Sequence, residues 1–540
     1  QHDCVTPDAV TFVCSLKACG GTGAIEKGQE IHVEVERKGL VESNPFIGST
    51  LVDMYAKCGL LGKALDIFNR LLVRDVISWN AIIAGYANYG FGQEALKYYG
   101  LMQTEGVSPD VVTFLSGLRA CSSVNEKGRG EEIHEQVARR GWLDKDVLLG
   151  STLVDMYAKC GWLMKAQHVF DHLQVRDVVL WNTLIGGYVE HGHAEVALKL
   201  FEGMQLEGMP PDASTYICSL KACGNLGAAF KGLKIHADIA TKWCLGVHIV
   251  LDNTLIDMYA KFGWLTEVKE VFNKLRDLDV VSWNVLIAGY ASDEDCYEEA
   301  LEFFKTMEIE GFSADAITLV SCLIACSNMG SIDKGQGIHA KIVEKGFSDK
   351  DAFIGSTIVN MYTNFGLLLD AQNVFDKLLE RSLVIWNTLI GGYAQLGAYE
   401  TSLHIYERMI GEEGIQGDEV TFVSILNACS NAGKIEAGQS FYKSMIEHCC
   451  DNLMVTPEHH ACMVDILSRA GCIDMAVAML EKMPFQPGVV LWLTLLGSCR
   501  KWGNIEHGKL AFEHAIQLVE KDAAPYVCMF NIYADADAAI

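Results

Sequence analysis

Apolar residues recur at helical spacing along this chain, in runs that glycine and proline interrupt. In residues 76–110, two runs fit amphipathic helices, with apolar positions at Ile77, Trp79, Ile82, Ile83 and Tyr86 and then at Ala95, Leu96, Tyr99 and Met102. Gly90 separates the two runs, and Gly106 and Pro109 close the second as C-cap and stop signals. No alternating strand pattern interrupts them, so the pattern predicts a helical hairpin.

This hairpin pattern returns at a nearly constant period. The motif "WNAIIAGY" recurs as "WNTLIGGY", "WNVLIAGY" and "WNTLIGGY", and its tryptophans lie 102, 102 and 103 residues apart, at Trp79, Trp181, Trp283 and Trp386. Two further hairpin patterns fill each interval, so one period holds pieces of about 35, 36 and 31 residues. Such a period predicts an all-α fold, an α-solenoid of helix-turn-helix repeats in which each repeat buries its apolar face on its neighbours.

Length and composition agree with an extended array. The 540 residues exceed what one hydrophobic core holds, and half of them are hydrophobic, which excludes a mainly disordered chain. No apolar run is long enough to cross a membrane. The first residues resemble neither a signal peptide nor a transit peptide and include no initiating Met, so we interpret the chain as a fragment without its targeting segment.

Cysteine usage and charge bear on the function. One cysteine recurs with the period, and we interpret these residues as small buried side chains: Cys19, Cys121, Cys223, Cys326 and Cys429. None of the nineteen cysteines forms C-x-x-C, and reduced thiols fit an intracellular or organellar compartment. The net charge of −26 lacks the basic footprint of nucleic-acid-binding proteins, so charge alone favours a protein–protein interaction scaffold.

The three recurring motifs resemble one known family. They are "WNTLIGGY" in the 35-residue pieces, "ACSNMGSIDKGQGIHA" in the 36-residue pieces and "STLVDMYAKCG" in the 31-residue pieces. In this combination and order they resemble the pentatricopeptide repeat proteins of plant organelles, in the PLS subclass, over essentially the whole chain. The resemblance implies a right-handed superhelix that binds single-stranded organellar RNA, one base per repeat, in a mitochondrion or chloroplast.

The resemblance also names the pieces, P for 35, L for 36 and S for 31 residues, and we divide the chain accordingly. Residues 1–8 are the remnant of a P piece, and 9–418 form the repeat array. Residues 419–488 are variant L and S pieces, and 489–540 are similar to a truncated E-type extension. The pieces within the array are L 9–44, S 45–75, P 76–110, L 111–146, S 147–177, P 178–212, L 213–248, S 249–279, P 280–315, L 316–351, S 352–382 and P 383–418.

In the family, the fifth and the last residue of a repeat select the base, which assigns an RNA-binding role to specific residues here. Asparagine with aspartate is the family's uracil pair, and an Asn amide supplies both a donor and an acceptor to a base edge. The P pieces hold four such pairs, Asn80 with Asp110, Asn182 with Asp212, Asn284 with Asp315, and Asn387 with Asp418. Their second residues would flank the base as apolar clamps, namely Ile77, Val179, Val281 and Val384.

The S pieces extend this assignment and the L pieces do not. Ser49 with Asp75 and Ser151 with Asp177 match the family's guanine pair, Asn253 with Asp279 matches uracil, and Ser356 with Ser382 leaves the base unassigned. The L pieces carry Val13, Leu115, Ile217, Val320 and Val423 at the fifth position, which offer no hydrogen bond, so they would supply spacing. The implied target reads 5′-G-U-n-G-U-n-U-U-n-n-U-3′, where n is unassigned.

Members of this family that edit cytidine to uridine carry a zinc deaminase domain with H-x-E and C-x-x-C motifs. H-x-E occurs here at His32 and at His193, but no C-x-x-C accompanies either, so we expect no metal, no cofactor and no enzymatic activity. His32 recurs as His134, His236 and His339, which predicts histidines packed between helices with a satisfied hydrogen bond. The cluster His459, His460 and Cys462 is interpreted in the same structural way.

Three functions therefore remain open at this point. The chain is a site-recognition factor for organellar RNA editing that recruits a deaminase-bearing partner through 489–540, or a truncated editing deaminase, or a protein–protein scaffold. We expect no small-molecule substrate and no membrane. Lys57, Lys159 and Lys261 recur at one position and would supply local positive charge for RNA binding, despite the net charge of −26, if they face the strand.

Overall fold

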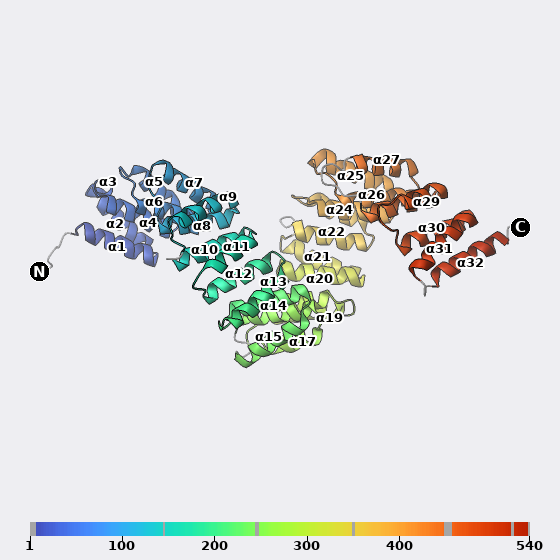
Figure 1. Ribbon diagram of the computed structural model, residues 1–540, viewed down its shortest axis with the longest axis horizontal. Coiled ribbons are helices and arrows are strands. Elements are labelled where there is room, and N and C mark those ends of the chain that lie inside the picture. Colours follow the sequence, from blue (N-terminus) through green and yellow to red (C-terminus); the bar gives the residue numbers. More distant parts are fainter. Residues whose placement is uncertain are drawn as a thin grey trace. The chain divides into compact units, whose positions relative to one another are not determined.

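The computed structural model describes residues 7–143, 146–242, 248–347, 352–447, 456–519 and 523–537, and the chain divides into two compact units, Gln1–Asp277 and Leu278–Ile540. Within the described ranges the chain consists of α-helices and turns without a strand, which confirms the all-α repeat fold (Figure 1). Most of the expected P remnant at 1–8, and parts of the expected extension at 489–540, lie outside the described residues.

In the first unit, each predicted L, S and P piece contains a first helix, termed the A helix, and a second, termed the B helix. The A helices are α1 (Ala9–Thr22), α4 (Pro45–Lys57), α6 (Val76–Asn88), α8 (Val111–Val124), α10 (Val147–Lys159), α12 (Val178–Glu190), α14 (Ala213–Leu226) and α16 (Ile249–Lys261). The B helices are α2 (Ile25–Arg37), α5 (Leu61–Arg70), α7 (Gly92–Thr104), α9 (Lys127–Arg139), α11 (Leu163–His172), α13 (Ala194–Leu206), α15 (Ala229–Lys242) and α17 (Leu265–Asn273). A short helix, α3 (Leu40–Ser43), follows α2 and was not expected from the sequence.

The second unit continues the same alternation. Its A helices are α18 (Val280–Ala291), α20 (Ala316–Met329), α22 (Ala352–Asn364), α24 (Leu383–Gln395), α26 (Glu419–Ala432), α28 (Pro457–Arg469), α30 (Val489–Trp502) and α32 (Ala524–Asp537). Its B helices are α19 (Tyr297–Ile309), α21 (Ile332–Glu344), α23 (Leu368–Lys377), α25 (Tyr399–Glu413), α27 (Ile435–Glu447), α29 (Ile473–Glu481) and α31 (Ile505–Leu518).

Within each unit, every A helix packs on the A helices before and after it, so the A helices form one continuous layer. Glycine in the "AGY" and "GGY" motifs permits this close approach. A Cβ at Gly85 of α6 would lie only 2.9 Å from the Cβ of Ala56 on α4, and Gly187 meets Ala158 in the same way. The repeated glycine is therefore a packing requirement between neighbouring A helices.

The motif tryptophan fixes how each P-piece A helix is rotated in this layer. Trp79 is 1% exposed and meets the edge of Phe68 with ring centroids 4.8 Å apart. Arg74 stacks on the other side of Phe68 and forms an ion pair with Glu105 at 2.8 Å. The same arrangement recurs around Trp181 and around Trp386. Because Trp79 points into the core, the next residue, Asn80, is held at the boundary with the following A helix.

The recurring cysteines are core residues, and the recurring histidines pack partly buried between helices, as expected. The periodic cysteines are at most 7% exposed. Each L-piece histidine joins its Nδ1 to the hydroxyl of a tyrosine on the next A helix, at 2.6–3.0 Å, in the pairs His32–Tyr55, His134–Tyr157, His236–Tyr259 and His339–Tyr362. Burial lowers the pKa of all four histidines. These residues therefore hold L pieces onto S pieces.

Candidate functional site

The four asparagine–aspartate pairs predicted in the P pieces all form, and a threonine completes each of them. The Asn80 amide donates from Nδ2 to Oδ1 of Asp110 at 2.9 Å, and the Thr113 hydroxyl lies 2.5 Å from Oδ1 of Asn80. Distances at the other three sites agree within 0.1 Å, in the networks Asn182–Asp212–Thr215, Asn284–Asp315–Thr318 and Asn387–Asp418–Thr421.

The aspartate of each network has two structural roles at once. Asp110 is the N-cap of α8, where Oδ1 accepts from the Thr113 backbone N–H at 2.9 Å, and the Thr113 hydroxyl accepts from the Asp110 backbone N–H at 3.1 Å. This is a capping box, which satisfies two otherwise unpaired donors at the helix start. The network thus links the fifth residue of a P piece to the first turn of the next L piece.

Aspartate also determines which way the amide points. An ionised carboxylate only accepts hydrogen bonds, so the amide NH₂ of Asn80 must face Asp110 and its oxygen must face Thr113. Each bound amide then keeps one N–H and one carbonyl lone pair for an outside partner. Since the carboxylate, the hydroxyl and the helix start are all fixed, the edge that the asparagine presents is set in advance.

These networks are mostly shielded from solvent. Asn80, Asn284 and Asn387 are 9%, 5% and 8% exposed, and Asn182 is half-buried. Burial tends to raise the pKa of Asp212, Asp315 and Asp418, but hydrogen bonds from the threonine backbone and the asparagine amide outweigh it. The pKa values of these three aspartates therefore lie below that of an ordinary aspartate.

The serine pairs of the S pieces differ from one another. Ser49 donates to Oδ1 of Asp75 at 2.9 Å and also lies 2.8 Å from the Pro45 carbonyl. Ser151 donates to the carbonyl of Val147, one turn earlier on its own helix, and Asp177 caps α12. A serine hydroxyl has one proton, so the local carbonyl competes with the aspartate. Of the two expected guanine pairs, the structure joins Ser49 to Asp75 but does not join Ser151 to Asp177.

In the S piece 352–382, no hydrogen bond joins Ser356 to Ser382. Ser356 donates to the carbonyl of Phe353 on its own helix, and Ser382 begins α24 without a side-chain capping bond. Asn253 belongs to the first unit and Asp279 to the second, so their pairing stays a prediction.

The predicted apolar clamps are exposed and belong to a longer row. Ile77, Val179, Val281 and Val384 are 53–66% exposed on the first turn of their A helices. Exposed apolar residues also occupy the second position of most L and S pieces and of the 489–522 segment, which sequence reasoning left unnamed: Val10, Phe46, Val112, Leu148, Val250, Ile317, Phe353, Val420 and Val490. The shared second position in each piece could have revealed these apolar residues from the sequence. In the same way, a threonine recurs three residues after each network aspartate, and this recurrence could have revealed the threonine.

The recurring lysines, which would offset the negative charge if they faced a strand, are paired with acids. Lys57 forms an ion pair with Asp53 at 2.7 Å, Lys159 with Asp155 at 2.9 Å, and Lys261 with Asp257 at 2.9 Å, each one turn apart on an A helix. The aspartate four residues earlier neutralises each lysine. These lysines therefore do not offset the negative charge of the chain.

The structure gives the histidine and cysteine candidates protein partners. His459 contacts Thr456 and the Glu419 carbonyl, while Cys462 donates to Asn427, so this cluster packs as interpreted. Glu195 of the second H-x-E forms an ion pair with Lys199. Across the ranges that the structure describes, no three His, Cys, Asp or Glu side chains gather as metal ligands, and no helix is long and apolar enough to cross a membrane.

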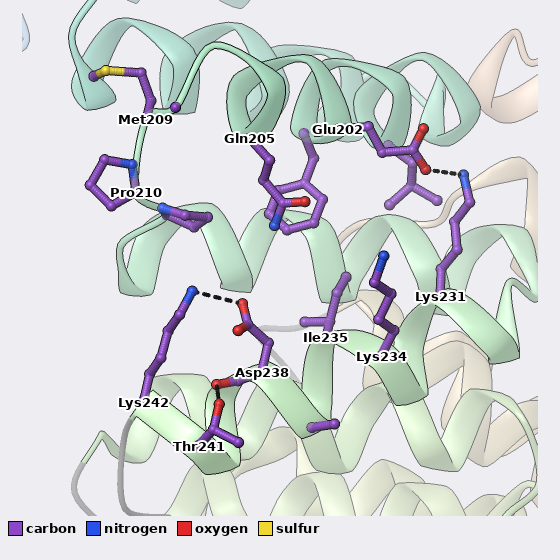
Figure 2. A pocket seen from close by; sticks show the side chains of 15 residues that line it. Glu202, Gln205, Met209, Pro210, Lys231, Lys234, Ile235, Asp238, Thr241 and Lys242 are labelled. Carbon is purple, nitrogen blue, oxygen red and sulfur yellow. Dashed lines mark hydrogen bonds and ion pairs between the residues drawn. The ribbon is translucent and has the colours of Figure 1, made fainter.

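A cavity of about 630 Å³ in the first unit is lined by residues outside the networks. Figure 2 shows that it is lined by the B helices α13 and α15 and the turn at Met209 and Pro210. Lys231 pairs with Glu202 across it, and Lys242 pairs with Asp238. None of its lining residues belongs to a network or to the clamp row, so we do not assign the cavity to base reading.

Comparison with known proteins gives evidence of the family of this chain that is independent of its structure. The PPR repeat family matches residues 74–123, 176–225 and 278–328, and the PPR repeat matches 49–76, 151–178, 253–280, 384–413, 420–450 and 461–485. In Arabidopsis thaliana, the chloroplastic pentatricopeptide repeat-containing protein DOT4 is 34% identical over 99% of this chain and 60% of its own length. A mitochondrial one is 31% identical over 98% of this chain and 75% of its length. The chain spans 60–65% of the length of three further relatives that are 32–33% identical.

The solved structures that are similar to this chain show the same fold. The pentatricopeptide repeat protein PPR10 from maize superposes with a TM-score of 0.59 at 16% identity, covering 98% of this chain and 85% of PPR10. PPR10 in complex with an 18-nt psaJ RNA element gives a TM-score of 0.64 at 18% identity, covering 97% and 82%.

Proposed function

Because this chain belongs to the pentatricopeptide repeat family, we propose that it binds single-stranded RNA by sequence, with P and S repeats each selecting one base. The observation that carries the proposal is the fourfold Asn–Asp–Thr network. It presents one oriented amide edge at the same point of every P piece, beside an exposed apolar clamp. An oriented donor–acceptor edge next to an apolar surface is suited to hold and read an unstacked base.

The bound form of PPR10 supports RNA as the ligand. Asparagine with aspartate supports uracil, because the free N–H and the free carbonyl lone pair of the amide match the O4 acceptor and the N3–H donor of that base. Cytosine offers the opposite order of donor and acceptor on the same edge. We therefore propose 5′-G-U-n-G-U-n-U-U-n-n-U-3′ as the preferred sequence.

The test measures binding of the chain to 5′-GUAGUAUUAAU-3′ and to a permuted RNA of the same composition, by fluorescence anisotropy. The proposal requires tighter binding to the first RNA. Equal binding to both, or none, contradicts it and would favour the alternative of a protein–protein scaffold, which the net charge of −26 supports.

A single substitution tests the amide orientation within the same assay. In Asp110→Asn, residue 110 can donate as well as accept, so the Asn80 amide is free to reverse and uracil loses its advantage over cytosine at that nucleotide. Asp146→Asn is the matched control. Asp146 also caps an A helix, accepting from Leu148 and Leu149, but the fifth residue of its piece is the aliphatic Leu115. The Asp146→Asn control should leave base preference unchanged. If Asp110→Asn also leaves the preference for uracil over cytosine unchanged, the argument from amide orientation is wrong.

We further propose that the RNA is an organellar transcript and that the chain marks a cytidine for editing to uridine, with the deaminase supplied by a partner docked on 489–540. The names of its chloroplastic and mitochondrial relatives support the compartment. The PLS order of the pieces and the E-type segment support the editing role. Reading the gene beyond codon 540 for H-x-E and C-x-x-C tests the alternative that the deaminase belongs to the same protein.

A further inference from the structure

Three exposed cations share one position on the A helices of the L pieces. The ninth residue of these pieces is Lys17 on α1, Arg119 on α8 and Lys221 on α14, and all three side chains are exposed. Within the part of the chain that the structure describes, no ion pair or hydrogen bond joins any of the three to an acid. They differ in this from Lys57, Lys159 and Lys261, each of which an aspartate one turn away neutralises.

Their place on the helix puts them on the face that carries the clamp row. The ninth residue follows the second by seven positions, which is two helical turns, so both project from the same side. On α8 the clamp-row residue is Val112, which is 49% exposed, and Arg119 lies about 10 Å further along the axis. A strand whose bases meet the first turn of each A helix would therefore pass its backbone near the second or third turn.

The balance of charge on this face singles out the L pieces. In the S pieces of the first unit, the ninth residue is acidic (Asp53, Asp155 or Asp257) and its lysine cancels it. In the P pieces of the first unit, the ninth residue is the uncharged Ala84 or Gly186. One uncompensated cation thus remains in each L–S–P period. Glu190, at the end of α12, and Lys221 act in opposite directions on the pKa of the neighbouring Cys218, so an acid lies on the same side of α14 as Lys221.

We propose that Lys17, Arg119 and Lys221 form a phosphate-binding track for the RNA backbone. This inference depends on the RNA-binding function proposed above and gives the L pieces a role in it. Their aliphatic fifth residues read no base, and their ninth residues hold the strand between the bases that P and S pieces read. In the second unit the ninth residues of the L pieces are Ile324 and Asn427, so the track is confined to the first unit.

The salt dependence of binding tests the track, because each phosphate contact releases counterions. For a single strand, every contact contributes a slope of about −0.7 to log Kobs against log salt concentration. With the 11-nucleotide RNA extended at its 5′ end, so that the strand also passes the L piece 9–44 that holds Lys17, the triple variant Lys17→Gln/Arg119→Gln/Lys221→Gln should therefore lower the magnitude of the slope by about 2. Affinity should fall most at low salt, while preference for the target over the permuted RNA is kept.

Three further variants separate the track from a general effect of net charge. Lys97→Gln removes an exposed lysine from the B helix α7, away from the A-helix face, and should leave the slope unchanged. Ile324→Lys with Asn427→Lys extends the track into the second unit and should increase the slope. The double variant Lys17→Arg/Arg119→Lys keeps both positive charges and should have the same slope as the original chain.

The outcomes separate this inference from the function on which it depends. If the triple variant keeps the slope of the original chain while Asp110→Asn still changes base preference, the track is wrong and RNA reading stands. A slope that falls equally with Lys97→Gln shows a general charge effect and also overturns the track. Absence of RNA binding by the original chain overturns both.

Discussion

The two units contain the same Asn–Asp–Thr networks but carry different charges along their A helices. Networks with closely similar distances occur at Asn80 and Asn182 in the first unit and at Asn284 and Asn387 in the second. The S piece of the second unit at 352–382, however, has Asn360 and Asn364 in place of the aspartate and lysine of the first unit. The later S-like piece balances its charge through an Asp465–Arg469 pair.

This difference teaches that the residues proposed to read a strand and those proposed to hold it occupy different kinds of position. The network residues are buried and tied to a helix cap, so a change there leaves a donor or acceptor without a partner. The charged positions are exposed, where substitution costs little stability. Charge on this face therefore varies from one unit to the other without a change in the fold.

The largest effect is expected from the motif tryptophans, which should matter equally in both units. Trp181→Ala or Trp386→Ala removes a core ring that packs on Phe170 or Phe375, at a cost of about 3–5 kcal/mol. Hydrogen exchange should show lost protection in the repeats that adjoin each substitution, because a repeat contacts only its neighbours. Full protection in those repeats would contradict the assigned packing, and Trp502→Ala, at an exposed ring, is the control.

The threonines should matter next, and again in both units alike. Thr113→Val or Thr421→Val leaves the asparagine oxygen without its hydroxyl partner, which should cost about 1–2 kcal/mol of stability. It should also relax the choice between uracil and cytosine at the nucleotide that the preceding P piece reads. Thr113→Ser keeps the hydroxyl and should keep the preference. Thr152→Val, whose hydroxyl bonds only the Leu148 carbonyl, is a control that should not alter base choice.

Acidic pH should destabilise the first unit more than the second. Burial lowers the pKa of the L-piece histidines, of which His32, His134 and His236 lie in the first unit and His339 in the second. A histidine whose folded pKa is depressed stabilises the fold fully above its ordinary pKa of about 6.5, and this contribution is lost as the pH falls further. Burial also lowers the pKa of His459 in the second unit, so three such histidines in the first unit face two in the second. Hydrogen exchange at pH 7.5 and 5.5 should therefore show a greater loss of protection in the first unit.

His134→Gln tests the cause of that pH dependence. Glutamine does not titrate, so the repeats around residue 134 should lose less protection between the two pH values than they do with histidine. An unchanged pH response there would assign the effect to other groups. His32 has Glu36 at 3.6 Å, which favours the protonated form, so its region should respond less than that of His236.

The smallest effect is expected from the lysine–aspartate ion pairs, which occur in all three S pieces of the first unit. Lys159→Met should change the free energy of unfolding by no more than about 0.5 kcal/mol, because the pair with Asp155 is exposed and one turn apart on a helix. A thermal melt of the variant checks this. A loss of several kcal/mol would mean that the lysine has a packing role that the structure does not show.

Much of this protein could be predicted from the sequence alone. The fixed period of the "WN" motif predicted stacked helical hairpins, because only copies of one unit repeat their apolar spacing so regularly. The same period showed that an asparagine at the place of Asn80 and an aspartate at the place of Asp110 recur in every P piece, and the resemblance to a known family joined them as a pair. The buried cysteines, the packed histidines and the structural His459 cluster also followed from their place in the repeat.

The tertiary structure decided what each polar side chain bonds to. It brought Thr113 onto Asn80, and it directed Ser151 to its own helix while Ser49 reaches Asp75. It also paired Lys57 with Asp53 and left Lys17 exposed. A sequence pattern specifies which face of a helix a residue occupies. Which of several nearby acceptors captures its hydrogen bond depends on differences of a few tenths of an ångström, and only the packed neighbours set those distances.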